Sequence, residues 1–418
     1  MEVRKNDWKV GVVGGGAAGM MAAITAARAG AKVTILEAGD RLGQKILSTG
    51  NGKCNLGNLD LNLSNYHGSC EFLRECFQQF GTKDTVRFFE EIGLYVKEKN
   101  GLLYPLCEQA SAVLDVLRFE VAAREIRVLT GFKIHEVKVT EKGILAVGDE
   151  RREKFDALIL STGGKAMPKT GSDGSGYELA KKLGHAVTPV VPALTALKCK
   201  GDFFKSIAGV RTDAGIELLD KNGKVIDTDR GELQLTDYGI SGIPVFQISR
   251  TALYEIKRNQ VANICIDFLP SLGSDEESLR KIARERKRLC KGRTAEECMT
   301  GIMPKKIMAL LLKRANVRLT DPAEAMSEKT ILGILKDAKR FMVCAVDSQG
   351  FQNCQVCAGG VDFGEVDRNL ESKKWKNLFF AGELLDVDGK CGGYNLQWAW
   401  TSGYLAGSAA AERRGNNS

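Results

Sequence analysis

The chain has 418 residues, of which 44% are apolar and 27% are charged, with a formal net charge of +8. The length predicts two or three domains, and the composition is typical of a globular, water-soluble protein. We expect no membrane span and no secretion signal, because no long uncharged apolar run and no apolar segment with a cleavage site is present. Twelve scattered cysteines without a disulfide framework then suit a reducing cytoplasm.

The first recognisable pattern is a strand, a helix and a second strand. Residues 9–13 form a short apolar run that predicts a buried parallel strand. The alanine-rich segment 17–29 predicts a helix, and residues 32–36 predict the second strand. An acid, Glu37, closes that strand. This order is that of a βαβ unit.

Three glycines between the first strand and the helix have G-x-G-x-x-G spacing. Gly14 permits the tight turn, Gly16 lets the backbone approach a pyrophosphate, and Gly19 allows close packing of the helix on the sheet. The helix N-terminus offers N–H groups to a phosphate, and Glu37 can accept hydrogen bonds from an adenosine ribose. The stretch predicts a dinucleotide site and does not distinguish NAD from FAD.

Two further segments suit the same site. The loop from residue 41 to residue 58 contains Arg41 and Lys45 among glycines, which is typical of backbone that wraps a pyrophosphate. Residues 127–147 predict a meander of short strands crossing to the sheet edge, in which Ile134 is the expected backbone contact for adenine.

The next strand is predicted at residues 156–160 and ends in the turn Ser161-Thr162-Gly163-Gly164. Such a turn is typical of FAD proteins whose nucleotide domain is built from two segments. The sequence GSDGSG at 171–176 precedes an expected helix at 177–183 without a strand directly before it. We interpret it as a helix N-terminus near the cofactor and not as a second nucleotide fingerprint.

The middle of the chain has shorter apolar runs. Asp220-Lys221-Asn222-Gly223 predicts a hairpin turn, and strands are expected near 206–212, 232–235 and 261–268. Residues 274–318 predict helices, Ser327 is the expected cap of a helix that ends at Lys339, and a strand follows at 341–346. The basic run 280–293 has Leu279, Ile282 and Leu289 on one predicted face, which favours a solvated charged helix over an RNA-binding one.

The C-terminal part predicts how the nucleotide domain is completed. Residues 376–380 predict a buried strand, after which Gly382 and Glu383 are expected at the ribityl chain or pyrophosphate. A helix is expected over Asn395 to Ala410, with Gly392, Gly393 and Tyr394 bringing its N-terminus against the flavin. Its free N–H groups would favour the negative charge of reduced flavin. Gly393→Val is therefore expected to lower the flavin potential or FAD occupancy while leaving folding nearly unchanged.

The chain resembles the flavoprotein family that includes aminoacetone oxidase and the bile-acid-inducible ene-reductase of gut bacteria. The resemblance covers nearly the whole chain and rests on GGGAAG at 14–19, GQKILSTGNGKCNLGN at 43–58, STGGKAMPKTGSDGSGYELAKKLGH at 161–185, LTDYGISG at 235–242 and AGELLDVDGKCGGYNLQWAW at 381–400. It implies non-covalent FAD, and a loop from Gly50 to Cys54 beside the middle ring of the flavin.

The expected fold is α/β, with a two-segment Rossmann-like FAD-binding domain, a β-barrel-like insert and a small helical insert. The FAD-binding domain is assigned to 1–187 and 346–418, the β-rich insert to 188–270 and 320–345, and the helical insert to 271–319. The predicted cofactor contacts are Gly14, Gly15, Gly16, Ala17, Ala18, Gly19, Glu37, Ala38, Arg41, Lys45, Gly50, Asn51, Gly52, Lys53, Cys54, Ile134, Thr162, Gly163, Gly164, Gly382, Glu383, Gly392, Gly393, Tyr394, Asn395 and Leu396.

The sequence and the resemblance leave three functions open: two enzyme reactions and one binding function. NAD(P)H could dock transiently, since no second nucleotide fingerprint is present, and reduce FAD, which then reduces a C=C bond conjugated to a ketone. The alternatives are an amine oxidase that uses oxygen and a flavin-carrying RNA-binding or RNA-modifying protein. Leu102, Cys107 and Cys391 stand where relatives often have polar residues, which favours the ene-reductase and a hydrophobic substrate. Tyr104, Tyr238, Ser241 and Cys391 are the candidate substrate contacts.

Cysteine and histidine chemistry is not expected to contribute. Cys354 and Cys357 have redox spacing, but in a strand residues three apart point to opposite faces, so we predict a coincidence. Cys54 is predicted to be a packing or flavin-contact residue and not a redox thiol. No metal site is expected, because the three histidines are far apart in the sequence and no cysteine cluster has iron–sulfur spacing.

Overall fold

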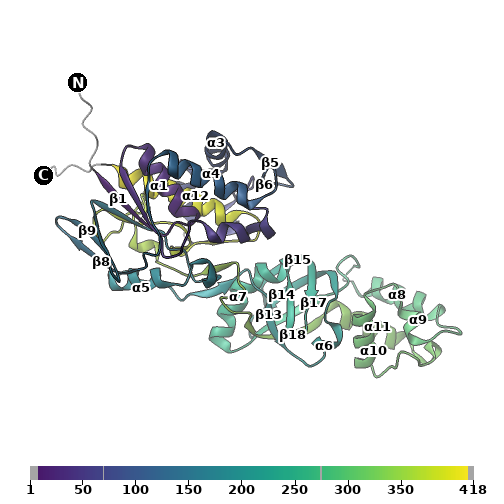
Figure 1. Ribbon diagram of the computed structural model, residues 1–418. Coiled ribbons are helices and arrows are strands. Elements are labelled where there is room, and N and C mark those ends of the chain that lie inside the picture. Colours follow the sequence, from purple (N-terminus) through teal and green to yellow (C-terminus); the bar gives the residue numbers. More distant parts are fainter. Residues whose placement is uncertain (1–7, 69, 274, 413–418) are drawn as a thin grey trace. The chain divides into compact units, whose positions relative to one another are not determined.

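The computed structural model describes residues 8–68, 70–273 and 275–412. The chain divides into two compact units: residues up to Val191 with those from Phe351 onward form the first, and Pro192–Gly350 form the second. Figure 1 shows purple N-terminal and yellow C-terminal elements together in the first unit. The two ends of the chain therefore build one unit, and the second unit is an insertion in it. The division into three domains remains a proposal.

Five parallel strands form the central sheet of the first unit. Val10 to Val13 are all buried, as expected where helices cover both faces of a parallel sheet. Leu158 pairs with Leu378, so the C-terminal segment adds a strand directly beside the N-terminal ones. The strand order is β20 (Leu378–Phe380), β11 (Ala157–Leu160), β1 (Lys9–Val13), β2 (Lys32–Leu36) and β7 (Arg127–Leu129).

Two long helices from opposite ends of the chain pack against each other. These are α1 (Ala17–Arg28), purple in Figure 1, and α12 (Tyr394–Ala411), yellow beside it. A Cβ on Gly403 or Gly407 of α12 would lie 2.4 Å from a carbonyl oxygen of α1. Only glycine permits this approach, so small residues at a four-residue spacing set the distance between the helices.

The other elements of the first unit surround this core. The expected meander is only partly correct, because β7 joins the parallel sheet whereas the following strands form a separate antiparallel sheet. The elements are η1 (Gln44–Gly52), β3 (Gly57–Asn58), η2 (Leu63–Asn65), β4 (Tyr66–His67), α2 (Cys70–Gln79), α3 (Thr82–Glu91), β5 (Val96–Lys99), β6 (Leu102–Pro105), α4 (Ala110–Ala123), β8 (Ile134–Thr140), β9 (Gly143–Gly148), β10 (Arg152–Phe155), η3 (Pro168–Thr170), α5 (Ser175–Lys182), β19 (Val356–Ala358), η5 (Phe363–Glu365), η6 (Gly382–Leu384) and β21 (Asp388–Gly389).

The second unit contains a closed six-stranded barrel. The turn at Asp220 to Gly223 joins two of its strands, as predicted. The strand expected at 206–212 is wrong in its first half, since α6 (Phe204–Ile207) occupies that segment and Gly209 has a φ of +84° before the strand begins. The barrel order is β13 (Leu197–Lys200), β16 (Gly239–Gly242), β15 (Val225–Leu235), β14 (Arg211–Leu219), β17 (Ala262–Asp267) and β18 (Phe341–Ser348); α7 (Ile243–Asn259) follows β16.

Four helices complete the second unit: α8 (Glu276–Arg288), α9 (Ala295–Met299), α10 (Lys305–Arg314) and α11 (Glu328–Lys339). The predicted cap of α11 is confirmed, because the Ser327 side chain accepts a hydrogen bond from the Thr330 N–H. Leu289 is exposed and comes directly after the last residue of α8, so the predicted helical face ends before it. Ser274, where the helical pattern was expected to begin, lies outside the described residues.

No helix within the described part of the chain combines the length and the apolar character needed to cross a bilayer.

Candidate functional site

A large pocket lies in the first unit, where the central parallel strands end. Val13, Glu37, Ser161 and Gly382 each follow or close one of these strands and line the pocket. Ligands of open α/β sheets bind at this edge of the sheet. The full lining is Val13, Gly14, Gly16, Ala17, Ala18, Glu37, Ala38, Arg41, Gly43, Gln44, Lys45, Ile46, Thr49, Phe132, Lys133, Ile134, Ser161, Thr162, Gly163, Thr170, Gly171, Ser172, Ser175, Leu179, Gln355, Val356, Gly382, Glu383, Val387, Asn395, Leu396, Trp398 and Ala399.

The first glycine loop meets the pocket with bare backbone. A Cβ on Gly16 would meet nothing within 4 Å, so this position leaves open space at the N-terminus of α1. Gly14 has a φ of +97°, and a Cβ on Gly19 would lie 1.9 Å from the Gly14 carbonyl oxygen. Gly14 and Gly19 therefore set the turn and the packing, and Gly16 forms a cradle into which a ligand oxygen fits.

Glu37 ties the loops on either side of it together. Its Oε2 accepts a hydrogen bond from the Gly15 N–H, and its Oε1 accepts one from the Gly39 N–H, both at 2.7 Å. A carboxylate has about four acceptor sites, so a ribose hydroxyl can still bind it. Glu37 thus orders the glycine loop as well as facing the pocket.

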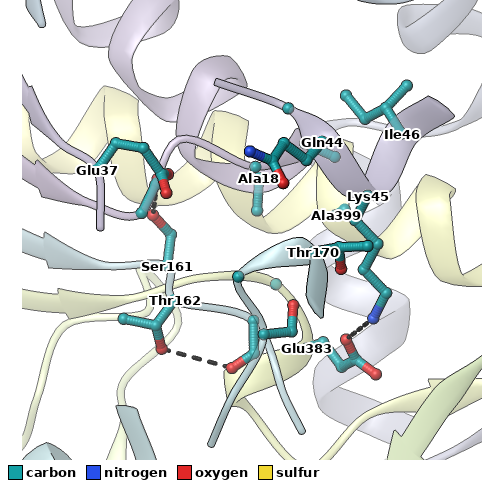
Figure 2. A pocket seen from close by; sticks show the side chains of 18 of the residues that line it. Ala18, Glu37, Gln44, Lys45, Ile46, Ser161, Thr162, Thr170, Glu383 and Ala399 are labelled. Carbon is teal, nitrogen blue, oxygen red and sulfur yellow. Dashed lines mark hydrogen bonds and ion pairs between the residues drawn. The ribbon is translucent and has the colours of Figure 1, made fainter. Parts of the chain in front are cut away.

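One wall of the pocket carries an ion pair between residues 338 positions apart in the sequence. The Lys45 Nζ lies 2.8 Å from the Glu383 Oε2, and Figure 2 shows the amine directed at the carboxylate. The other oxygen of Glu383 accepts a hydrogen bond from the Cys357 N–H at 2.7 Å. Sequence reasoning placed both charged residues at the cofactor without predicting this pair.

Another part of the wall comes from the segment before β8. Phe132, Lys133 and Ile134 all line the pocket, and the Phe132 N–H donates to the Glu37 carbonyl oxygen at 2.9 Å. Lys133 also forms an ion pair with Asp173 at 2.7 Å, which joins this segment to the loop before α5. Ile134 was expected here, and the two residues before it were missed because nothing in their local pattern distinguishes them.

The N-terminal end of α12 contributes Asn395 and Leu396 to the lining. The Asn395 side chain holds the preceding loop by donating to the Gly389 carbonyl oxygen at 2.8 Å and accepting from the Gly389 N–H at 2.9 Å. Gly393 caps the helix with a φ of +90°. A Cβ there would lie 2.6 Å from the Gly57 carbonyl oxygen, so the expectation that Gly393→Val leaves folding nearly unchanged is contradicted by this backbone contact.

Several predicted cofactor residues lie outside the pocket lining, and their contact with the flavin remains a prediction. Gly15 and Gly19 support the glycine loop from behind, with their Cβ positions facing Leu42 and the Gly14 backbone. The others are Gly50, Asn51, Gly52, Lys53, Cys54, Gly164, Gly392, Gly393 and Tyr394. Of the substrate candidates, Tyr104 and Cys391 belong to the first unit, whereas Tyr238 and Ser241 belong to the second.

The pocket also has lining residues that sequence reasoning missed. Gln355 and Val356 come from a turn and a short strand with no motif, and Ile46 and Thr49 come from a loop of which other members were named. Gly171, Ser172 and Ser175 belong to the GSDGSG segment and its helix, which was expected near the cofactor. The rest of this group is Val13, Gly43, Gln44, Phe132, Lys133, Ser161, Thr170, Leu179, Val387, Trp398 and Ala399.

The cysteines differ from expectation in one respect. Burial raises the pKa of the Cys54 thiol to about 12, which suits the predicted packing role. The expectation that Cys354 and Cys357 point to opposite faces is wrong, because Cys354 precedes β19 and is free of strand alternation. The two thiols hydrogen-bond to each other in a small buried cluster with Ala166. Among the described residues, no group of three His, Cys, Asp or Glu could hold a metal ion.

The pocket fits FAD. Bare backbone faces open space at Gly16, the N-terminus of a twelve-residue helix points to the same place, and Lys45 supplies a positive charge. Glu37 and the backbone before β8 lie together at a position suited to adenosine. Sheet order, split chain and pocket define the protein as a Rossmann-type FAD-binding protein.

Comparison with known proteins identifies the family. The family model for the HI0933-like protein Rossmann domain matches residues 8–409, so the chain belongs to the HI0933-like family. It is 45% identical over 412 residues to a 3-dehydro-bile acid Δ(4,6)-reductase of Clostridium scindens, covering 97% of this chain and 99% of that protein. A ribosomal RNA dihydrouridine synthase of Escherichia coli is 28% identical, with 94% of this chain and 95% of that protein covered.

A solved structure agrees with the fold. The 3-ketosteroid Δ4-(5α)-dehydrogenase of Rhodococcus jostii superposes with a TM-score of 0.50 at 15% identity, covering 99% of both chains. At this identity the similarity supports the shared architecture alone. The predicted family, fold class and flavoprotein assignment are therefore confirmed.

Proposed function

We propose that this protein uses FAD to reduce a C=C bond conjugated to a ketone in a hydrophobic, steroid-like or bile-acid-like substrate. The observation that carries the proposal is the 45% identity, over 97% of the chain, to the bile-acid reductase of Clostridium scindens. Bound FAD supplies two-electron transfer as a hydride at N5. NAD(P)H is proposed as the donor that reduces it.

The residues proposed to hold FAD are those that the pocket brings together. Glu37 and the backbone at Ile134 would bind adenosine, and Gly14 and Gly16 with the N-terminus of α1 would bind the pyrophosphate. Lys45 and Glu383 lie in the same wall, where the lysine offsets phosphate charge and the acid accepts hydroxyl hydrogen bonds. The other predicted pocket residues that belong to this proposed set are Ala17, Ala18, Ala38, Arg41, Thr162, Gly163, Gly382, Asn395 and Leu396.

For substrate binding, Tyr104 and Cys391, both in the first unit, are proposed as contacts, whereas Tyr238 and Ser241 remain predictions from the sequence. The Tyr104 phenol lies near Lys53, which forms an ion pair with Glu108 at 2.8 Å. Desolvation raises the pKa of Tyr104, so its hydroxyl keeps its proton at neutral pH and can donate a hydrogen bond to a ketone. Nicotinamide would dock transiently, since the chain carries a single G-x-G-x-x-G fingerprint with strand and helix in register.

The two alternatives receive less support. The amine-oxidase reading conflicts with the reductase activity named for the 45% identical relative. The RNA alternative relies on the basic run, which the sequence analysis interprets as a solvated charged helix. In the structure Lys287 donates to the carbonyl oxygens of Glu324 and Met326, and Arg286 donates to those of Cys298 and Thr300. Arg280 pairs with Glu276. Much of the positive charge in α8 therefore serves the fold of its own unit.

The proposal is tested by anaerobic reduction of the FAD-loaded protein in two half-reactions. NADH or NADPH should bleach the flavin band, and a bile acid with a 3-oxo-4,6-diene should restore it with loss of one C=C bond. A saturated 3-oxo bile acid is the matched control and should leave the flavin reduced.

Three results would contradict the proposal. The first is a flavin that aminoacetone or another primary amine reduces and pyridine nucleotides do not. The second is reduced flavin that the diene leaves unchanged. The third is reoxidation by a uridine-containing ribosomal RNA fragment in preference to the diene, which would favour the RNA-modifying alternative.

A further inference from the structure

Two cysteines flank a short segment of the pocket wall, although strand alternation predicted that their side chains point to opposite faces. Both thiols are 1% exposed, and they hydrogen-bond to each other beside Ala166. Cys354 lies in the turn before β19, and Cys357 lies within this strand. The turn makes the contact possible, because side-chain alternation holds only within regular strand.

The pair is connected to the pocket on two sides. Gln355 and Val356, the two residues between the cysteines, both line the pocket. The Cys357 N–H donates to the Glu383 Oε1 at 2.7 Å, and the other oxygen of Glu383 binds the Lys45 Nζ at 2.8 Å. A change in the backbone at Cys357 is therefore passed to the ion pair through a single hydrogen bond.

The local polar contacts fit a dithiol and not a metal site. The Cys357 sulfur accepts a hydrogen bond from the Lys165 N–H at 3.2 Å, and the Cys354 thiol is directed at the Phe351 carbonyl oxygen at 3.5 Å. No third ligand for a metal ion gathers here among the described residues. The hydrogen bond with Cys354, burial and the charge of Glu383 raise the pKa of the Cys357 thiol, so this sulfur is protonated at rest.

We propose that Cys354 and Cys357 are a reversible dithiol–disulfide site whose oxidation state alters the wall of the FAD pocket. The oxidant is a small-molecule disulfide of the glutathione class. One protein thiol loses its proton and its sulfur attacks the oxidant, which releases one glutathione thiolate. The second protein thiol, once deprotonated, displaces the other glutathione. The protein loses two electrons and two protons, and the oxidant gains both as two thiols.

Disulfide formation would affect the cofactor pocket because it closes a short ring of covalent bonds. A disulfide between residues three apart closes a ring that contains the backbone of Gln355 and Val356 and restricts their conformations. The oxidised and reduced forms thus present different surfaces to FAD. This inference needs only that the pocket binds FAD, so it can hold even if the proposed bile-acid-like substrate is wrong.

The test uses the full chain with FAD bound. The protein is equilibrated in glutathione buffers of increasing oxidised fraction, denatured in acid, alkylated and digested with trypsin. The peptide from Phe341 to Arg368 contains Cys344, Cys354 and Cys357. We expect Cys354 and Cys357 to lose alkylation together, with loss of the mass of two hydrogen atoms, while Cys344 stays alkylated. Dithiothreitol should reverse the change.

Matched variants separate the pair from its neighbours. Cys344→Ser should leave the transition in place, whereas Cys354→Ser should abolish it and leave Cys357 alkylated or as a mixed disulfide. Complete alkylation of Cys354 and Cys357 at every buffer ratio, with and without FAD, would overturn the proposed disulfide. Pairing of either residue with Cys344 would also overturn it.

A second measurement examines the link to the pocket. The FAD dissociation constant, measured by flavin fluorescence, should differ at least about threefold between the oxidised and reduced protein, a change of about 0.7 kcal/mol. Equal dissociation constants in the two states would overturn the link. The exchange rate should rise about tenfold per pH unit between neutrality and the thiol pKa, since the thiolate is the attacking species.

Discussion

The helices α1 and α12 both begin at a glycine, but the two glycines have different structural roles. Gly16 caps α1 with an ordinary φ of −77°, and a Cβ there would enter open pocket space. Gly393 caps α12 with a φ of +90°, and a Cβ there would strike the Gly57 backbone. The first is glycine so that a ligand can approach, and the second is glycine because the chain itself is already in contact. A glycine at the start of a helix can therefore reflect either space needed for a ligand or close contact with another part of the chain.

The comparison can be tested with one spectroscopic probe. The four tryptophans, Trp8, Trp375, Trp398 and Trp400, all belong to the first unit, so tryptophan fluorescence during unfolding reports that unit alone. FAD affinity is measured separately on the folded protein. A substitution at a position that supports folding should lower the free energy of unfolding and leave FAD affinity nearly unchanged. A substitution at a position that faces the ligand should do the reverse.

The largest effect is expected for Gly19→Val. The Cβ would lie 1.9 Å from the Gly14 carbonyl oxygen, and relief of this overlap would separate α1 from the glycine loop. We expect the free energy of unfolding of the first unit to fall by more than about 4 kcal/mol, in urea titrations followed by tryptophan fluorescence. A variant with an unchanged midpoint would show that α1 does not pack on Gly14 as described.

The next largest effect is expected for Gly393→Ala. A left-handed residue costs about 1–2 kcal/mol when it is not glycine, and the contact with the Gly57 carbonyl adds to that cost. We expect the free energy of unfolding to fall by about 2–4 kcal/mol, with FAD affinity of the folded fraction changed less than about threefold. Normal stability with a lower flavin potential or occupancy would instead support the direct flavin contact expected from the sequence.

Gly16→Ala is the matched substitution at the other helix and should give the opposite pattern. Its φ suits alanine and its Cβ meets no protein atom within 4 Å, so the urea midpoint should be unchanged. The methyl group would occupy space proposed for the pyrophosphate, and the FAD dissociation constant should rise about tenfold, or about 1.4 kcal/mol. An unchanged dissociation constant would place the phosphates away from Gly16.

The last prediction concerns only the reactivity of one thiol, with no change in stability or FAD affinity, and it tests the α12 side of the comparison, where Cys54, Leu56 and Gly57 are buried. Burial raises the pKa of Cys54 to about 12. Since the thiolate is the reactive form, alkylation by iodoacetamide at pH 8 should be at least about a thousandfold slower than for a free cysteine and should rise about tenfold per pH unit. The exposed Cys107 is the internal control. Equal rates for the two thiols would contradict a buried Cys54.

Local patterns were enough to predict much of the fold. The strand at 9–13, the helix that starts beside Gly16 and the acid Glu37 follow from hydrophobic periodicity and the glycine spacing, which act within a few residues of each other. The cap at Ser327 and the hairpin at 220–223 follow for the same reason. The split nucleotide domain was predictable because its C-terminal strand and helix carry their own clear patterns.

Tertiary structure decided the contacts between distant segments. The ion pair of Lys45 with Glu383, the place of Phe132 and Lys133 in the pocket, and the meeting of the Cys354 and Cys357 thiols depend on where loops fold back. No periodicity records such contacts, because a loop conformation is set by the elements that anchor it. Gly393 shows the same limit: its sequence predicts a turn, but only the neighbouring Gly57 backbone explains why no side chain fits there.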